Sequence, residues 1–226
     1  MNDVIEKIRG GLVVSVQALP GNPLRDTHCI ARLAAAAAAG GATAIRANGV
    51  EDLTAIRQLV NLPIIAINKR QPSPTDPYIT PYIEDAREIY GLGEIIAVDA
   101  TMRPDNLRAA NLIKQIHSET DALVMADIST LEEGIAAAEA GADIVATTLS
   151  GYTQYMTKTP GPDIALIKAL CNSVSVPIIA EGRFLSPADV DEGLKAGAHA
   201  VVIGKMITNA MFITKQFIEK SGRIRK

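Results

Sequence analysis

Charged and polar residues in this chain follow directly after short apolar runs, so that acid and base groups recur at similar positions along it. Carboxylate, lysine, arginine, glutamine and threonine side chains make up the set, and such groups suit proton transfer on an anionic small molecule. In chain order they are Gln17, Arg46 with Asn48, Lys69 with Arg70, Asp99, Asp127, Thr147 with Thr148, Glu181 with Arg183, and Gly204 with Lys205.

Two other kinds of chemistry find little support in the residue types. The three histidines, His28, His117 and His199, fall outside this set, which predicts no metal site. There is no Gly-x-Ser-x-Gly motif and no Cys/His pair after an apolar run, so the usual nucleophilic triads are absent. A structural alternative stays open, because buried charges must be paired. Four of the residues could form an ion-pair network that only closes one end of the fold, namely Arg46, Lys69, Asp127 and Glu181.

A second pattern predicts a seat for an anion near the end of the chain. Glu181-Gly182-Arg183 and Ile203-Gly204-Lys205 each place a glycine beside a cation directly after an apolar run. Glycine lets the backbone approach a ligand closely, and backbone N–H groups in such turns bind phosphate. Gly182, Arg183, Gly204 and Lys205 are therefore predicted to bind a phosphate group, although the glycines could also serve only tight turns.

These residues need a scaffold that brings eight strand ends together. Short, β-branched, mostly continuous apolar runs recur about every 27 residues, which favours repeated strand-helix units with a sheet covered on both faces. We expect strands at 12–16, 44–47, 63–67, 94–98, 122–126, 143–146, 177–180 and 199–203. We expect helices at 27–39, 51–59, 82–91, 104–118, 130–140, 162–172, 186–196 and 208–220.

Eight such units predict an α/β protein with a single (β/α)8 TIM barrel domain spanning residues 1–226, with a doubly wound open sheet as the rival. In this barrel the active site lies at the carboxyl ends of the strands, where the polar set falls. The proline-rich segment 70–81 is expected to form a long active-site loop there.

The amino-acid composition indicates which classes of binding partner the chain is expected to have. The 226 residues include 48% hydrophobic residues and carry a net charge of −3, without blocks of like charge. We therefore expect a folded protein with a small-molecule substrate and with neither a nucleic acid nor a membrane partner. The first ten residues show no secretory signal, and Cys29 and Cys171 suggest no disulfide framework, so a cytoplasmic location is expected.

Several longer stretches, taken together, resemble one known family over essentially the whole chain. They are residues 14–21, 45–48, 62–69, 78–81, 98–101, 125–130, 147–153 and 179–183, including Val14-Ser15-Val16-Gln17 and Ala180-Glu181-Gly182-Arg183. The chain resembles the N-acetylmannosamine-6-phosphate 2-epimerases of bacterial amino-sugar and sialic acid catabolism. The resemblance implies an isomerase that needs no cofactor, interconverts N-acetylmannosamine 6-phosphate and N-acetylglucosamine 6-phosphate by moving the C2 proton, and forms a homodimer.

The resemblance also implies roles for individual residues. Lys69 would be the acid/base at C2, with Glu181 as its carboxylate partner, and burial beside Arg46 could keep that lysine neutral. Gln17 and Arg46 would orient the sugar and its N-acetyl group. Asp127 would hydrogen-bond substrate hydroxyls or hold the lysine. Gly182 and Gly204 would seat the phosphate through their N–H groups.

One departure from the family pattern leaves alternatives open. Asn209 stands where the family usually has a phosphate-binding arginine, and Lys205 could supply the missing charge. The alternatives are a barrel isomerase acting on a different amino-sugar or acid phosphate, and a barrel that binds a sugar phosphate without turning it over.

Overall fold

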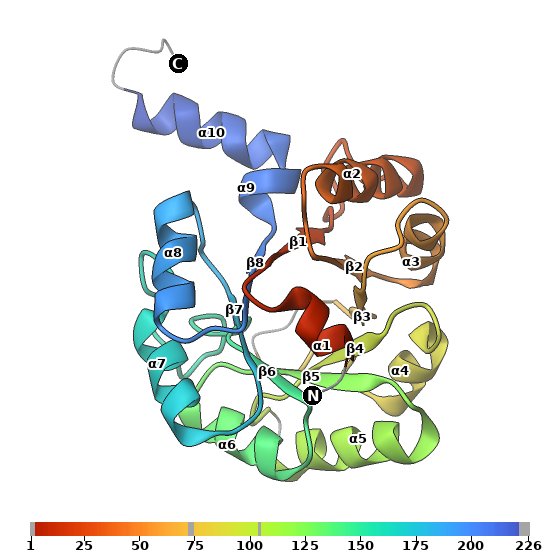
Figure 1. The fold of residues 1–226 in the computed structure, drawn as a ribbon, viewed down its shortest axis with the longest axis vertical. Coiled ribbons are helices and arrows are strands. Elements are labelled where there is room, and N and C mark those ends of the chain that lie inside the picture. Colours follow the sequence, from red (N-terminus) through yellow and green to blue (C-terminus); the bar gives the residue numbers. More distant parts are fainter. Residues whose placement is uncertain (1–2, 72–74, 104, 222–226) are drawn as a thin grey trace.

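The computed structural model describes residues 3–71, 75–103 and 105–221 and contains a closed barrel of parallel strands in sequential order (Figure 1). The open-sheet alternative is therefore wrong. The strands are β1 (Leu12–Val16), β2 (Ala44–Asn48), β3 (Ile64–Ile67), β4 (Ile95–Asp99), β5 (Leu123–Asp127), β6 (Ile144–Ala146), β7 (Ile178–Glu181) and β8 (Ala200–Ile203). The helices are α1 (Asp3–Ile8), α2 (Thr27–Ala39), α3 (Val50–Arg57), α4 (Ile83–Ile89), α5 (Asn106–Glu119), α6 (Leu131–Glu139), α7 (Ile164–Ser173), α8 (Pro187–Lys195), α9 (Lys205–Thr208) and α10 (Ala210–Lys220).

Alternation along the strands divides the core into two layers. One layer fills the barrel, and the other lies between the strands and the surrounding helices. On β3, for example, Ile65 and Ile67 point into the barrel while Ile64 and Ala66 face the helices. Because the side-chain period of a strand is two, Lys69 continues the inward row of Ile65 and Ile67 just beyond the strand end.

The same alternation holds around the barrel and brings the polar set to its inner rim. The inward rows of β1, β2, β4, β5, β6, β7 and β8 continue from buried apolar residues to polar ones or glycine. These rim positions are Ser15 and Gln17, Arg46, Asp99, Asp127, Thr148, Glu181 and Gly204.

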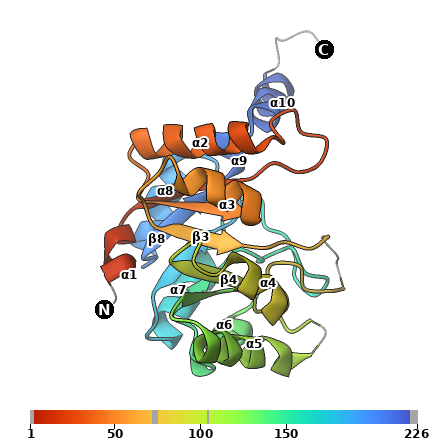
Figure 2. The same ribbon diagram turned by 90° about the vertical axis from the view of Figure 1, so that its right-hand side faces the viewer.

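Expected and observed elements agree to within a few residues, but the first helix is missing from the prediction. In α1, Ile5 and Ile8 are buried in the barrel layer, and Nε2 of His199 hydrogen-bonds the carbonyl of Ile5 at 2.8 Å. Figure 2 shows α1 at the end of the strands opposite the long loops. Six residues are too short for a periodic pattern to reveal a helix.

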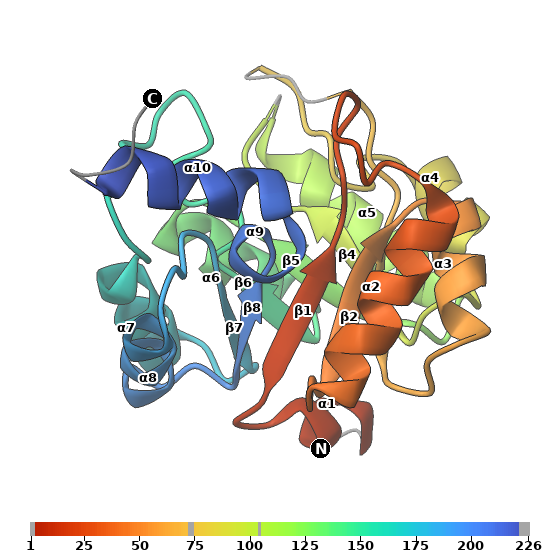
Figure 3. The same cartoon turned by 90° about the horizontal axis from the view of Figure 1, so that it is seen from above.

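The expected helix 208–220 is also different in the structure, where the short α9 precedes α10. The break falls at Asn209, whose Oδ1 accepts the backbone N–H of Phe212 at 2.9 Å and so caps α10. No residue of α10 is buried, and the helix lies outside the ring of helices and across the direction of β8 (Figures 1 and 3). Among the described residues, no helix has the length and apolar character that crossing a membrane requires.

The loop after β3 returns beside its own start. Lys69 and Ile79 form an antiparallel bridge, and the N–H of Arg70 donates to the carbonyl of Tyr78 at 2.9 Å. This pairing holds Tyr78 and Ile79 beside Lys69 and Arg70. Pro72 and Pro74 of the expected loop, and Pro104 at the expected start of the next helix, lie outside the described residues.

Candidate active site

Lys69 is held at both its backbone and its amine. Its N–H donates to Oδ1 of Asn48 at 2.8 Å, and its Nζ donates to Oε1 of Gln17 at 2.8 Å. Burial first, and then the positive charge of Arg46, lower the pKa of Lys69 to about 8. A lysine with such a pKa is partly neutral near physiological pH and can both remove and return a proton.

Arg46 lies between two carboxylates with only 1% of its side chain exposed. Its Nη2 and Nη1 contact the two oxygens of Asp127 at 2.5 and 3.1 Å, and Nη1 also donates to Oε2 of Glu181 at 2.7 Å. Burial alone would lower the pKa of the guanidinium, but the charges of Asp127 and Glu181 outweigh it and raise that pKa above its ordinary value. The arginine therefore stays charged and fixes both carboxylates. Its buried Nε is the one atom of this group without a hydrogen-bond partner in the described chain.

Glu181 stands at the end of β7 with 16% of its side chain exposed. Burial raises the pKa of its carboxyl group, against the opposing charge of Arg46. The hydroxyl of Thr148 lies 3.1 Å from Oε2 of Glu181 and 2.6 Å from Oδ1 of Asp127, so its single proton can serve either carboxylate. The raised pKa makes Glu181 a better proton donor and acceptor partner than an exposed carboxylate would be.

A cluster of Asp99, Arg103 and Tyr78 lies beside Lys69. Asp99 is buried and accepts the backbone N–H of Tyr78 at 3.1 Å and Nη2 of Arg103 at 3.0 Å. The ring of Tyr78 has its centre 6.0 Å from Nζ of Lys69. Burial raises the pKa of Tyr78 to about 12, so its hydroxyl stays protonated. Tyr78 has no role predicted from the sequence, because its place in a long loop carries no strand periodicity.

The structure brings Gln17, Arg46, Lys69, Asp127 and Glu181 to one rim, joined in two hydrogen-bonded groups. One group pairs the amide with the lysine, and the other joins the arginine to the carboxylates. Ser15 and Thr148 also belong to the rim but had no role predicted from the sequence. Their positions in the inward-facing rows of β1 and β6 are the sequence signal that could have identified them. Ser15 accepts the side-chain amide of Gln17 at 2.7 Å.

The predicted phosphate residues are placed differently from one another. Gly182 has a φ of +111°, a conformation that favours glycine. A Cβ on Gly204 would lie 3.4 Å from Cβ of Ser15, which places this glycine in van der Waals contact with β1. Lys205 is exposed, with its Nζ 5.8 Å from the ring of Phe212. The guanidinium of Arg183 turns to the loop after β6.

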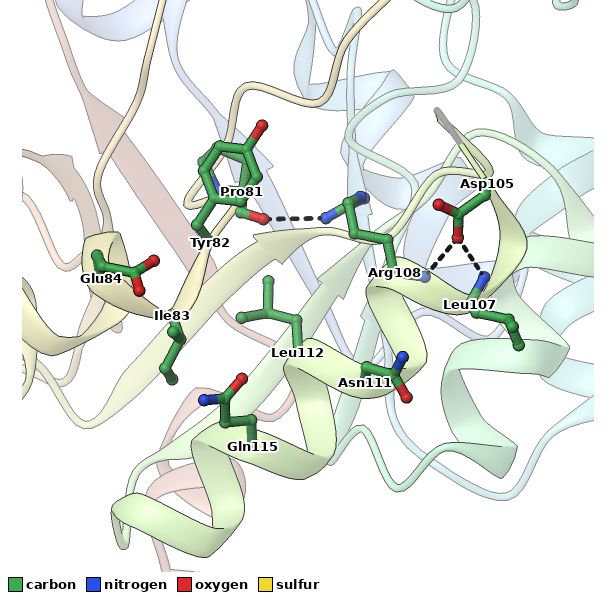
Figure 4. Close-up of a pocket in the computed structure, with 10 residues that line it drawn as sticks. All are labelled: Pro81, Tyr82, Ile83, Glu84, Asp105, Leu107, Arg108, Asn111, Leu112 and Gln115. Atoms are coloured by element: carbon green, nitrogen blue, oxygen red, sulfur yellow. Dashed lines mark hydrogen bonds between the residues drawn. The ribbon is translucent and has the colours of Figure 1, made fainter.

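In the part of the chain that the structure describes, neither a metal cluster nor the surface pocket between α4 and α5 coincides with the rim residues. Within the described ranges, no three His, Cys, Asp or Glu residues are placed to hold a metal ion. A pocket of about 520 Å³ lies on the outer surface between α4 and α5, and none of the predicted site residues lines it (Figure 4). Its lining includes Tyr82, Glu84, Arg108 and Leu112.

The fold and the rim define a class of protein, a (β/α)8 barrel that carries a lysine, an arginine and two carboxylates at the carboxyl ends of its strands, the residue types that suit proton transfer. Comparison with known proteins identifies the family. A family model described as "Putative N-acetylmannosamine-6-phosphate epimerase" (NanE) matches residues 30–223, and the chain belongs to this family.

Relatives of the chain match it along nearly its whole length. A curated protein of Caldanaerobacter subterraneus, named "Putative N-acetylmannosamine-6-phosphate 2-epimerase", is 46% identical over 220 residues, which cover 96% of this chain and 93% of that protein. A protein of the same name from Clostridioides difficile is 43% identical, covering 96% of this chain and 98% of its own. The solved structure of the N-acetylmannosamine-6-phosphate 2-epimerase from Clostridium perfringens superposes with a TM-score of 0.91 at 41% identity, covering 96% of both chains.

Proposed function

We propose that this chain is a cofactor-independent isomerase that interconverts N-acetylmannosamine 6-phosphate and N-acetylglucosamine 6-phosphate by moving the proton at C2. The observation that carries the proposal is the partly buried Lys69, with a pKa of about 8, on the same rim as the Arg46, Asp127 and Glu181 group. Family membership and the names of the relatives supply the substrate. The whole chain is proposed to act as one barrel domain.

The C2 hydrogen becomes acidic when the sugar is in its open form, because C2 then lies next to the C1 aldehyde. Neutral Lys69 removes this proton, and the electron pair moves onto the carbonyl oxygen to form an enolate. Return of a proton to the opposite face of C2 restores the aldehyde with inverted configuration. Glu181, whose pKa burial raises, is the partner that exchanges a proton with the lysine or with the substrate.

The other rim residues bind and orient the substrate. Gln17 holds Nζ of Lys69 and, together with Arg46, faces the sugar and its N-acetyl group. Asp127 keeps Arg46 charged and in place. Gly182, Gly204 and Lys205 are proposed to seat the phosphate, with the lysine as a point charge.

The departure at position 209 has a local reason in this chain. Asn209 caps α10 through its hydrogen bond with the N–H of Phe212. This role accounts for the asparagine without a change of substrate, and no observation of the site favours a different sugar phosphate or a barrel without activity.

Proton NMR in D₂O tests the proposed function directly. N-acetylmannosamine 6-phosphate incubated with the purified protein is expected to yield N-acetylglucosamine 6-phosphate with deuterium at C2. Lys69→Ala and Glu181→Ala are expected to lose this activity while keeping the fold, as judged by circular dichroism. Lys168→Ala, on the exposed face of α7, is the matched control. Near-normal turnover by a folded Lys69→Ala protein would refute the assigned role.

A homodimer is part of the proposal and has support in the uncovered surfaces of α10. Phe217 and Met211 on this helix are 68% and 46% exposed. An apolar groove of about 290 Å³ lies beside α2 and β1, lined by residues including Leu12, Leu33 and Ile207. Pairing two chains, with α10 of each against the groove of the other, would remove both apolar surfaces from water. Light scattering on the purified protein gives the mass.

A cytoplasmic location is likewise proposed. Cys29 and Cys171 are both free thiols, as is usual for proteins of a reducing compartment. Fractionation of cells that express the protein would place the activity.

A further inference from the structure

Arg183 adopts a backbone conformation that arginine rarely takes. Its φ is +62°, and it follows Gly182, whose φ is +111°. Two consecutive residues of positive φ turn the chain sharply just after Glu181. Such a conformation is costly for a residue with a Cβ and persists only where surrounding contacts hold it.

Those contacts come from the loop between β6 and α7. The Arg183 guanidinium donates from Nη1 to the carbonyl of Ser150 at 2.6 Å, from Nε to the carbonyl of Gly161 at 2.7 Å, and from Nη2 to Oγ1 of Thr159 at 2.9 Å. All three acceptors are neutral oxygens of one loop, and no carboxylate of the described chain pairs with this arginine. One planar side chain therefore joins both ends of that loop to the turn after β7.

The loop is closely packed around this side chain. A Cβ on Gly151 would lie 3.3 Å from Nη1 of Arg183 and 2.8 Å from Cα of Lys158. The hydroxyl of Ser150 donates to Oδ2 of Asp163, the residue that caps α7, at 2.7 Å. The position of the loop thus depends on the arginine and leaves no space for an additional side chain at residue 151.

The start of this loop carries a residue that orients the proposed catalytic carboxylate. Thr148, two residues before Ser150, has its hydroxyl between the two carboxylates, 2.6 Å from Oδ1 of Asp127 and 3.1 Å from Oε2 of Glu181. Its neighbour Thr147 exchanges hydrogen bonds with the backbone of Glu181, accepting its N–H at 3.0 Å and donating to its carbonyl at 2.9 Å. Arg183 therefore binds Ser150 at one end of a short segment, and Thr147 and Thr148 at the other end of the same segment contact Glu181.

We propose that Arg183 is a positioning residue that clamps the loop after β6 to the turn after β7, so that Thr148 stays against Glu181. This role stands in place of the phosphate contact predicted from the sequence. Its effect on turnover rests on the proposed function of the rim, whereas its effect on the loop does not.

The experiment compares Arg183→Lys and Arg183→Met with the wild type in two independent ways. The lysine variant would keep the charge but lose the fork that reaches three acceptors, and the methionine variant would lose both. The first readout is limited trypsinolysis at Lys158, an exposed site within the loop, with hydrogen exchange of residues 150–161. The second is kcat together with competitive inhibition by inorganic phosphate.

Both variants are expected to be cleaved at Lys158 about tenfold faster than the wild type and to lose about tenfold in kcat. Inhibition by inorganic phosphate is expected to stay within about twofold. Thr159→Val, which removes one of the three acceptors, should move cleavage in the same direction by less. Arg87→Lys, an exposed arginine of α4, is the matched control.

Unchanged cleavage at Lys158, together with weaker inhibition by phosphate, would refute the clamp and support the phosphate contact that the sequence predicted for Arg183. Unchanged cleavage and unchanged phosphate inhibition would overturn it as well. If the wild type turns over no sugar phosphate, the proposed function fails, but faster cleavage in both variants would still support the clamp on the loop.

Discussion

The lowered pKa of Lys69 should appear in stability as well as in activity. Replacing Lys69 by methionine removes the amine but keeps most of the side-chain volume. In the folded protein the pKa of this lysine is about 8, against an ordinary value of 10.5 that applies to the unfolded chain. The unfolded chain therefore holds the proton between these two values while the folded protein has released it.

The sign of the effect follows from proton linkage. Stability rises with pH wherever the unfolded state binds more protons, so the wild type gains stability as pH increases from about 8 to about 10.5. Below about pH 8 the lysine is protonated in both states, and the partly desolvated ammonium of the folded state lowers the free energy of unfolding by its full amount, on the order of 3 kcal/mol. Between pH 7 and pH 10 the gain from this one group amounts to about 2.5 kcal/mol.

The assay is the thermal midpoint of wild type and Lys69→Met, measured at pH 7 and pH 10. At pH 7 Lys69→Met should have the higher thermal midpoint, because it lacks the ammonium. The difference in midpoint between the variant and the wild type should be roughly 5–10 °C smaller at pH 10 than at pH 7 for a chain of this size. Lys168→Met, on the exposed face of α7, should give no such change. In a parallel activity profile, wild-type kcat/KM should rise about tenfold per pH unit below pH 8 and level off near 8.

Parallel midpoints for wild type and Lys69→Met across this range would refute the reasoning, because they would mean that Lys69 has the same pKa in the folded and unfolded states. A kcat/KM that stays flat between about pH 6 and pH 9 would separately refute the neutral lysine as the base.

Three further perturbations follow from the contacts. Arg46→Met should lower the free energy of unfolding in urea by about 3–5 kcal/mol, because Asp127 is left buried without its charged partner. Adding Asp127→Asn should recover part of this loss, and strict additivity of the two single-variant effects would contradict the pairing. Glu133→Gln should cost about 1–3 kcal/mol, since its carboxylate accepts N–H groups from the loops after β4 and β5; Tyr155→Phe, which removes only one donor to it, should cost less. Phe217→Glu should shift the mass measured by light scattering from dimer toward monomer, and an unchanged dimer would exclude α10 from the interface.

Much of the fold could be read from the residue pattern because a barrel repeats one unit. Continuous β-branched runs at a regular spacing indicate parallel strands covered on both faces. The expected helix 27–39 matches α2 residue for residue, since Asp26 caps its start and Gly40 ends it. Strand ends also located the candidate site, because inward alternation carries Ile65 and Ile67 on to Lys69.

Some features needed contacts between residues far apart in the chain. Arg183 follows a glycine at a strand end, and this sequence position is equally compatible with an arginine that binds a phosphate and with one that binds a loop carbonyl. Only the folded loop brings Ser150, Thr159 and Gly161 to the guanidinium as acceptors. Likewise α1 is held by Ile5 and Ile8 packing inside the barrel, and six residues alone carry too little helical periodicity to show this.

The sequence by itself determined that Gln17, Arg46, Lys69, Asp127 and Glu181 fall at the carboxyl ends of strands, because strand period is a local property and the strand-helix unit repeats along the chain. Tertiary structure alone decided what those residues can do there. A pKa of about 8 for Lys69 requires burial and the charge of Arg46, which lies 23 residues earlier, and Arg46 stays charged because Asp127 and Glu181 reach it from β5 and β7. Burial and charge act through space, so neither can be read from neighbours in the chain.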